Sequence, residues 1–374
     1  MSVSGTSISR RLAVFASFSG QGGVEKMITN LAAGFLDAGV TVDLVLARAE
    51  GEHLESIPTG VRIVRLNVHH TSTALPGLVR YLRAEKPDAI LAAKDRAIRV
   101  ALLARKLAGS HAPLVGRLGT TVSAALKGKG WMRELTRYAG MRLFYPYLDA
   151  IVAVSQGVKD DILAITGLPS ERVRVIRNPV ITPALERQAA QPCDHPWLND
   201  PAVPVIVGMG RLTRQKGFPD LIAAFARLRR DRVCRLVVIG DGGDRDKLER
   251  LVKDLGVSEC VAFTGFLKNP HALVARCSLF VLSSLWEGSP NALTEAMALG
   301  RPVVSTDCPS GPAELLADGR YGALVPVGEV EALAAAMAHA LDRPLPAECL
   351  RRAVAEYTQS VSARRYLETL GIAP

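Results

Sequence analysis

Residues 203–230 read VPVIVGMGRLTRQKGFPDLIAAFARLRR, and this stretch shows the pattern that governs the whole chain. An apolar run of strand length comes first, glycines at positions 208, 210 and 217 mark a loop, and a helical segment begins near residue 218. A strand, a glycine-containing loop and a helix in this order form the first half of a βαβ unit. The stretch therefore predicts a parallel strand that is covered by a helix.

The same alternation runs through almost the entire chain. In the first half we predict strands near 11–17, 40–46, 61–66, 88–92, 113–117, 149–154 and 172–176, and helices near 23–38, 74–85, 96–108, 131–144 and 156–165. In the second half we predict strands near 203–209, 234–240, 260–264, 279–283 and 302–306, and helices near 218–230, 245–255, 270–276, 290–299, 312–317 and 329–342. This order predicts the α/β class, with helices on both faces of parallel sheets.

A proline-rich segment divides the chain, whose 374 residues already favour two domains over one. Six prolines fall between residues 179 and 204, which predicts a linker rather than a helix or a central strand. We therefore predict a first doubly wound domain over 1–178, a hinge over 179–202 and a second domain over 203–354. Residues 350–370 are predicted to form one further helix.

Composition excludes several classes of protein. The chain has no run of the roughly 18 apolar residues that a membrane span needs, and the apolar segment after its polar start is too short for a signal peptide. Its six cysteines form no CxxC pair and favour reduced thiols in the cytoplasm. The net charge of +10 suits an anionic substrate or membrane, and with no nucleic-acid-binding pattern visible we expect no nucleic acid partner.

The loop over 208–217 brings two cations to a strand end. Its glycines allow backbone amides to approach a ligand closely. Arg211 and Lys216 then suit a diphosphate, which carries charge on both phosphorus centres, beside a helix N-terminus. The alternative interpretation is a solvated basic loop.

Residues 286–300 predict a second site for an anion. Ser289 is expected to cap a helix that begins with Pro290 and ends at Gly300. The first turn of that helix would present open backbone amides to a ligand, those of Asn291, Ala292 and Leu293.

Two acids lie on either side of these amides. Glu295 lies about 7–8 Å along the helix from Pro290, in an apolar helix where an unpaired carboxylate is costly, and ribose hydroxyls would satisfy it. Glu287 precedes the helix and could contact a sugar. Structural roles for both acids, as a cap and as a salt-bridge partner, remain the alternative.

The turn SGQGGVE at residues 19–25 follows the first predicted strand and opens a helix. Its glycines do not have the G-x-G-x-x-G spacing, and Asp43 lies inside a strand, so a nicotinamide site is disfavoured. Gly22 and Gly23 instead predict a close approach of the helix N-terminus to a ligand. A plain tight turn is the alternative.

A basic amphipathic stretch covers residues 127–145. Lys127, Lys129, Arg133, Arg137 and Arg142 alternate with Trp131, Met132 and Leu135. Such a stretch suits an anionic membrane surface or a lipid-linked acceptor, which would make the protein peripheral on the inner face of the membrane. An ordinary solvated helix face is the alternative. The chain has no HExxH or clustered Cys/His spacing, and no G-x-S-x-G or P-loop motif, so we expect no metal centre, hydrolase triad or ATPase site.

Five ordered motifs in the second half resemble family 4 of the glycosyltransferases. They are Gly210-Arg211-Leu212 with Gln215-Lys216-Gly217, Ile239-Gly240-Asp241-Gly242, Phe263-Thr264-Gly265-Phe266, the pair Glu287 and Glu295, and Pro309-Ser310-Gly311-Pro312 with Gly322-Ala323-Leu324-Val325. The resemblance implies a GT-B fold, with two Rossmann-like domains facing a cleft and a C-terminal helix, about 355–374, packing back onto the first domain. It also implies retention of anomeric configuration and no essential metal or other cofactor.

The resemblance also implies roles for individual residues. Arg211 and Lys216 would neutralise the departing diphosphate, Glu287 would contact the donor sugar and Glu295 the ribose. The remaining donor-binding residues would be Gly22, Gly23, Gly210, Phe266 near the base, Asn291, Ala292 and Leu293. Many relatives carry a histidine after the strand near 113–117, where this chain has Arg117 and Thr120, so these two are the candidates for the acceptor side.

We therefore predict a retaining glycosyltransferase that moves a hexose or N-acetylhexosamine from a nucleoside-diphosphate sugar, with UDP as the nucleotide. The predicted acceptor is a polysaccharide or a lipid-linked sugar. A sugar-nucleotide epimerase or phosphorylase of the same fold and a non-catalytic sugar-nucleotide-binding protein are the alternatives.

Overall fold

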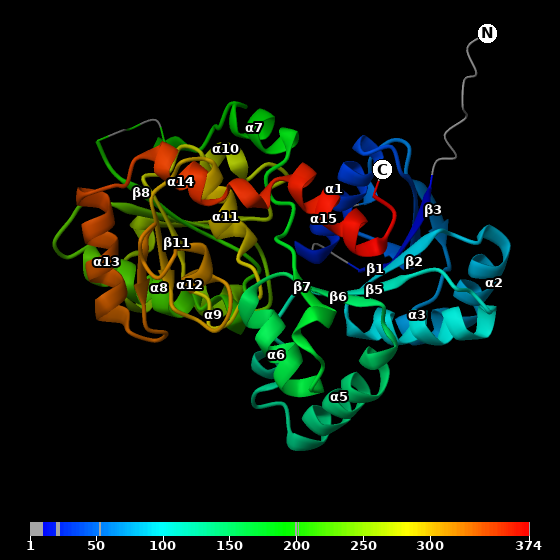
Figure 1. The fold of residues 1–374 in the computed structure, drawn as a ribbon. Coiled ribbons are helices and arrows are strands. Elements are labelled where there is room, and N and C mark those ends of the chain that lie inside the picture. Colours follow the sequence, from blue (N-terminus) through cyan, green and yellow to red (C-terminus); the bar gives the residue numbers. More distant parts are fainter. Residues whose placement is uncertain (1–9, 20–22, 52–53, 199, 201, 374) are drawn as a thin grey trace, which may run out of the picture. The chain divides into compact units, whose positions relative to one another are not determined.

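The computed structural model describes residues 10–19, 23–51, 54–198, 200 and 202–373. The chain divides into two compact units (Figure 1). The first consists of the residues up to Pro179 together with those from Thr358 onward, and the second runs from Val180 to Tyr357. Each unit is built on one parallel sheet.

The sheet of the first unit has seven strands in the order β3-β2-β1-β4-β5-β6-β7. The strands are β1 (Arg11–Ser19), β2 (Thr41–Glu50), β3 (Arg62–Arg65), β4 (Ala89–Ala93), β5 (Leu114–Leu118), β6 (Ala150–Ala153) and β7 (Val173–Val175). All neighbours pair in parallel. The chain order reverses between β1 and β4, and in such sheets ligands bind beyond the carboxyl ends of the strands at this point.

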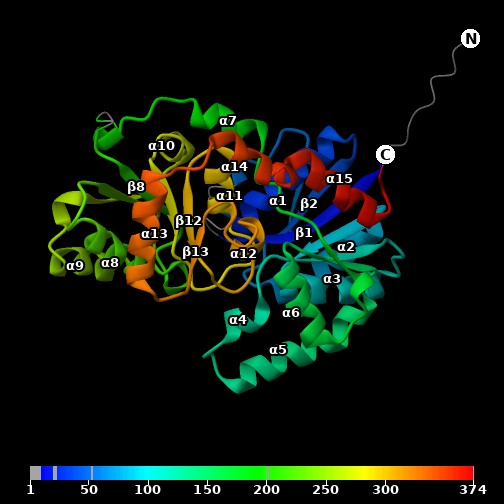
Figure 2. The same ribbon diagram turned by 60° about the vertical axis from the view of Figure 1, so that its left-hand side comes forward.

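Helices cover both faces of this sheet (Figure 2). One face packs against helices that include α2 (Leu75–Glu85), α3 (Asp95–Ala108), α5 (Trp131–Phe144) and α6 (Gln156–Thr166). The other face packs against α1 (Gly23–Asp37) and α15 (Gln359–Leu370). A short helix, α4 (Val122–Leu126), precedes α5. Because both faces are covered, the inner strands β4 (AILAA) and β6 (AIVA) are apolar along their whole length rather than alternating.

The C-terminal helix α15 packs closely against α1. A Cβ on Gly34 would lie 2.7 Å from the Cβ of Ala363, so the two helices need glycine at their contact. Phe35 and Tyr366 stack edge to face with ring centres 6.3 Å apart. The predicted single helix over 350–370 is wrong, because the chain bends between α14 (Ala347–Ala353) and α15, where the carbonyl of Tyr357 accepts hydrogen bonds from the amides of Val180 and Ile181.

The sheet of the second unit has six parallel strands in the order β10-β9-β8-β11-β12-β13. They are β8 (Val205–Met209), β9 (Arg235–Ile239), β10 (Val261–Gly265), β11 (Leu279–Leu282), β12 (Val303–Thr306) and β13 (Ala323–Val325). The chain order reverses between β8 and β11. The loops that follow these two strands therefore meet at one point of the sheet edge.

The core of the second unit lies between its sheet and three helices, α8 (Phe218–Leu228), α9 (Arg245–Asp254) and α13 (Val330–Asp342). The unit also contains α7 (Pro183–Ala189), α10 (His271–Val274), α11 (Asn291–Ala298), α12 (Pro312–Leu315) and α14. Of these, α11 contacts β11, β12 and α14, and α7 contacts α10.

Residues 179–202 differ from the predicted linker. They contain the helix α7, in which Pro183 is the first residue and the Thr182 hydroxyl accepts a hydrogen bond from the Leu185 amide at 3.3 Å. Proline is tolerated in the first turn of a helix because the amide it lacks has no partner there. The proline count therefore gave a wrong prediction at this point. Among the helices of the described residues, none is long and apolar enough to cross a membrane.

Candidate functional site

The loop that follows β8 is fixed by backbone hydrogen bonds to the neighbouring strand. The Gly210 amide donates to the Ile239 carbonyl at 2.9 Å, and the Leu212 amide donates to the Asp241 carbonyl at 2.9 Å. A Cβ on Gly240 would lie 2.0 Å from the Gly210 oxygen, so the two strand ends approach as closely as backbone allows. The predicted diphosphate loop is thus a rigid part of the sheet edge.

Gly217 is where this loop meets the end of β11. Its φ is +59°, and a Cβ there would lie 2.0 Å from the Ser283 carbonyl oxygen. Only glycine meets both demands without strain. The Ser283 hydroxyl donates to the Lys216 carbonyl at 2.9 Å, and the Leu285 amide donates to the Gln215 carbonyl at 2.8 Å. These contacts place Lys216 beside the loop after β11.

Lys216 and Glu287 form an ion pair in this position. The Lys216 Nζ lies 2.6 Å from Glu287 Oε1, and the side chains are 20% and 7% exposed. The Ser284 hydroxyl donates to the same oxygen at 2.7 Å, and the Thr306 hydroxyl donates to the Ser284 carbonyl at 2.6 Å. Two of the predicted catalytic residues, 71 positions apart in sequence, are therefore in direct contact.

Cys308 lies next to this pair and is not a nucleophile. The pKa of its thiol is raised to about 12, chiefly by burial and also by the negative charge of Glu287, while Thr306 and Lys216 act in the opposite direction. A thiol with so high a pKa stays protonated at neutral pH and is inert.

The start of α11 differs in detail from its prediction. Pro290 occupies the N-cap position rather than the first turn, and the hydroxyl of Ser289 is buried and makes no capping bond. The Asn291 amide donates to the Ser289 carbonyl at 3.0 Å, so it is not open. Within the described part of the chain, no acceptor pairs with the amides of Ala292 and Leu293. Two of the three predicted amides are therefore available to an anion.

Glu295 is buried and has a protein partner that the sequence did not reveal. Its Oε2 lies 3.4 Å from Nε2 of His271, the first residue of α10. The other ring nitrogen of His271, Nδ1, lies 2.8 Å from Oε1 of Gln188 in α7. The histidine gave no motif signal, and Gln188 fell within the predicted linker, so no local pattern joins the three residues.

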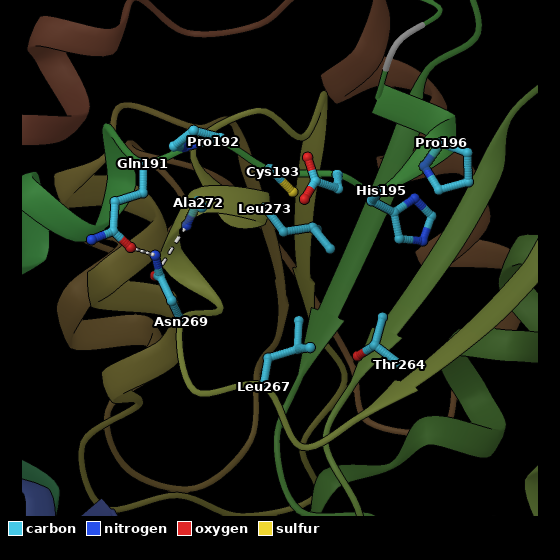
Figure 3. A pocket seen from close by; sticks show the side chains of 11 residues that line it. Gln191, Pro192, Cys193, His195, Pro196, Thr264, Leu267, Asn269, Ala272 and Leu273 are labelled. Carbon is cyan, nitrogen blue, oxygen red and sulfur yellow. Dashed lines mark hydrogen bonds between the residues drawn. The ribbon is translucent and has the colours of Figure 1, made fainter.

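A cavity of about 440 Å³ adjoins the residues expected to face the base (Figure 3). Thr264 and Leu267 form one side of it, on either side of Gly265 and the exposed Phe266. Figure 3 shows Gln191 and Asn269 joined by a hydrogen bond at its rim; the distance is 2.8 Å. Arg211, at the start of the loop after β8, is also exposed.

The predicted site residues of the first unit differ in how much surface they offer to a ligand. Gly22 lies outside the described residues, and Gly23 is the exposed first residue of α1. Arg117, in the fully buried strand β5, is only 1% exposed, and its Nη2 donates to Asn178 Oδ1 at 2.6 Å. Thr120, just after the strand, is exposed. Of the two candidates for the acceptor side, only Thr120 therefore offers surface to a ligand.

The basic stretch around α5 separates into two sets of residues. Arg137 is used within the fold, with Nε 3.1 Å from the buried Asp95, and the Arg142 Nε donates to the Ile165 carbonyl at 2.7 Å. Four cations of the stretch are exposed, namely Lys127, Lys129, Arg133 and, despite its bond to Ile165, Arg142. Beside them, three large apolar side chains are also exposed, namely Trp131 (73%), Met132 (64%) and Leu135 (55%).

Two family models match the chain. Residues 21–182 match the model described as Glycosyltransferase Family 4, and residues 203–343 match the one described as Glycosyl transferases group 1. The lipopolysaccharide core biosynthesis glycosyltransferase LpsE of Rhizobium meliloti is 29% identical over 96% of this chain and 98% of its own length.

A second relative matches a shorter part of the chain. The N-acetylgalactosamine-N,N'-diacetylbacillosaminyl-diphospho-undecaprenol 4-alpha-N-acetylgalactosaminyltransferase of Campylobacter jejuni is 32% identical over 61% of this chain and 60% of its own length. Among solved structures, Anabaena HepE in complex with UDP superimposes with a TM-score of 0.76 at 23% identity, over 97% of this chain and 99% of that one. With two parallel-sheet units in the chain, this likeness confirms the predicted GT-B fold class.

Proposed function

Because the chain belongs to family 4 of the glycosyltransferases, within glycosyltransferase group 1, we propose that it transfers a hexose or N-acetylhexosamine from a UDP-sugar to a glycan acceptor with retention of configuration. Family membership confirms the predicted class of enzyme, a transferase that acts on sugars. The observation that carries the proposal is the 2.6 Å contact between Lys216 and Glu287 at the point where the strand order reverses.

Charge stabilisation is the proposed source of catalysis. As the bond between the anomeric carbon and the diphosphate oxygen breaks, negative charge grows on the diphosphate. Lys216, Arg211 and the amides of Ala292 and Leu293 are fixed donors for that charge and need no reorganisation. The acceptor oxygen forms its bond on the face that the diphosphate leaves, and the departing diphosphate takes the acceptor's proton. These donors replace a metal ion in the proposal.

The names of the relatives support an acceptor of the lipid-anchored kind. The Campylobacter enzyme is named for a diphospho-undecaprenol-linked sugar, and LpsE for the core of lipopolysaccharide. We propose that the acceptor here is likewise a polysaccharide or a lipid-linked sugar, with Thr120 on its side of the reaction. We propose UDP as the nucleotide because HepE, which has the same fold, was solved in complex with UDP.

A membrane-facing role for α5 belongs to the same proposal. Lys127, Lys129 and Arg133 surround the exposed Trp131 and Met132, an arrangement that suits an anionic lipid surface. Each basic residue near such a surface contributes about 1 kcal/mol, which salt screens. We propose that the protein is peripheral and docks through this helix.

Donor selection is tested by thermal shift across UDP, GDP, ADP and dTDP, because a bound ligand raises the melting temperature by mass action. We expect UDP to give the largest rise, with no change on adding EDTA. Labelled UDP-sugars, incubated with the enzyme alone, should release UDP slowly and yield sugar with the α configuration of the donor. Binding without any turnover would instead indicate a sensor, and a donor with altered sugar stereochemistry would indicate an epimerase.

Membrane docking is tested by sedimentation with vesicles of phosphatidylglycerol and of phosphatidylcholine. Replacing Lys127, Lys129 and Arg133 by serine should reduce binding to the anionic vesicles, most at low salt. A control with the same loss of charge replaces three exposed cations of the second unit, namely Arg230, Lys253 and Arg343. Equal binding of both variants would contradict a role for α5.

A further inference from the structure

The proposed function does not use the contact between His271 and Glu295, which lies near the proposed donor site. We propose that His271 is a positioning residue that holds Glu295 for the ribose, so that the site selects ribonucleotides over 2′-deoxyribonucleotides. This inference rests on the proposed function, in which Glu295 accepts the ribose hydroxyls.

The three residues come from three separate helices. His271 in α10 is 3% exposed and Glu295 in α11 is 4% exposed, so neither charge nor ring is hydrated to any extent. His271 Nε2 lies 3.4 Å from Glu295 Oε2, and His271 Nδ1 lies 2.8 Å from Gln188 Oε1 in α7. The imidazole thus connects a buried carboxylate to a half-buried amide.

Proton placement on the ring follows from the chemistry of its two neighbours. A carboxylate only accepts hydrogen bonds, whereas the amide of Gln188 can present either its oxygen or its nitrogen. If Nε2 carried no proton, its lone pair would face the lone pairs of the Glu295 carboxylate. The arrangement that avoids this opposition has the proton on Nε2, donated to Glu295. The contact therefore favours one orientation of the carboxylate, and a carboxylate can accept several hydrogen bonds at once.

Gln188 is itself held in place by the loop expected to face the base. Asn269 Nδ2 donates to the Gln188 carbonyl at 2.9 Å. It also donates to Gln191 Oε1 at 2.8 Å, the bond that Figure 3 shows. Asn269 is three residues after Phe266. The same helix, α7, thus contacts both the loop near the base and the histidine that reaches Glu295.

A fixed carboxylate has a consequence for specificity. Sites built to hydrogen-bond a hydroxyl discriminate strongly against an analogue that lacks it, because the buried acceptor is then left unpaired. Loss of the histidine would let Glu295 turn away or recruit water. The affinity for the ribonucleotide should then fall, while the affinity for the deoxyribonucleotide, which gains little from the carboxylate, should change less.

The test compares the dissociation constants of UDP and 2′-deoxyuridine 5′-diphosphate by calorimetry. For the wild type we expect UDP to bind roughly 10–100-fold more tightly, the range for a hydrogen bond to a charged group. His271→Ala should reduce the preference for UDP to about threefold or less, chiefly by lowering the affinity for UDP. His271→Gln, whose amide can still donate to Glu295, should retain most of the preference. His339→Ala, at an exposed histidine of α13, is the matched control and should behave as wild type.

A double-mutant comparison separates positioning from a general structural role. Glu295→Gln by itself should lower the ratio of the two dissociation constants. Adding His271→Ala to it should have no further effect, because the histidine acts through the carboxylate. If His271→Ala weakens both nucleotides by the same factor, or if the wild type binds both equally, the inference is overturned. Failure of the wild type to bind any nucleoside diphosphate is a different result, because it would refute the proposed function itself.

Discussion

Breaking the ion pair between Lys216 and Glu287 should separate the structural role of Lys216 from its proposed role in binding the diphosphate. Lys216→Met removes the charge and keeps most of the aliphatic side chain, which leaves Glu287 buried without its cation. Removing one partner of a buried pair costs about 3–5 kcal/mol. Because Lys216 is 20% exposed and the Ser284 hydroxyl still donates to Glu287 at 2.7 Å, we expect about 2–3 kcal/mol of lost stability here.

The partner substitution should behave differently. Glu287→Gln keeps a hydrogen-bonding side chain, and the freed ammonium group of Lys216 still reaches water, so a loss of about 1 kcal/mol is expected. The double variant should lose less than the sum of the two, with a coupling of about 1–2 kcal/mol. Urea unfolding of variants that also carry Trp131→Phe, followed by the fluorescence of Trp197 and Trp286 in the second unit, measures these differences.

Binding provides the second half of this prediction, because the two substitutions should act in opposite directions. Lys216→Met should make the free energy of UDP binding less favourable by about 1.5–3 kcal/mol, the range for charged hydrogen bonds. Glu287→Gln should leave UDP affinity unchanged or higher, since the carboxylate no longer competes with the diphosphate for Lys216, while sugar transfer falls. Additive stability losses together with normal UDP binding by Lys216→Met would refute the reasoning.

Two further predictions concern the rigidity of the site and its response to pH. Gly217→Ala places a Cβ against a backbone oxygen at positive φ and should lower stability by about 2–4 kcal/mol in thermal melting, whereas Gly243→Ala, with no neighbouring atom within 4 Å of its Cβ, should be tolerated. Burial raises the pKa of Cys277 and of Cys308 to about 12. Above the ordinary thiol pKa the unfolded chain releases these protons and the folded chain keeps them, so stability should fall between pH 9 and pH 11; urea midpoints that rise over this range would contradict it.

Local signals in the sequence were sufficient to predict most of the helices and strands. Apolar runs, glycines and prolines act within a few residues, and the predicted strand over 203–209 and helix over 218–230 correspond to β8 and α8. The errors occurred where a tertiary contact outweighs a local rule. The prolines of 179–202 predicted a linker, but α7 forms there because it packs against α10. The short strand β13 was missed, because its three residues carry too little pattern.

Local patterns in the sequence selected the residues of the proposed donor site, because Arg211, Lys216, Glu287 and Glu295 follow predicted strands or lie in a predicted helix, and the bounds of such elements are local properties. Their partners were decided by the tertiary structure alone. Lys216 meets Glu287 because β8 and β11 are neighbours in the sheet, although 69 residues separate their ends in sequence order, from 209 to 279. Glu295 meets His271 only once α10 and α11 have folded together in the second unit. Arg117 is buried only because other parts of the first unit cover β5. Strand order and burial are long-range properties, and no periodicity within one segment records them.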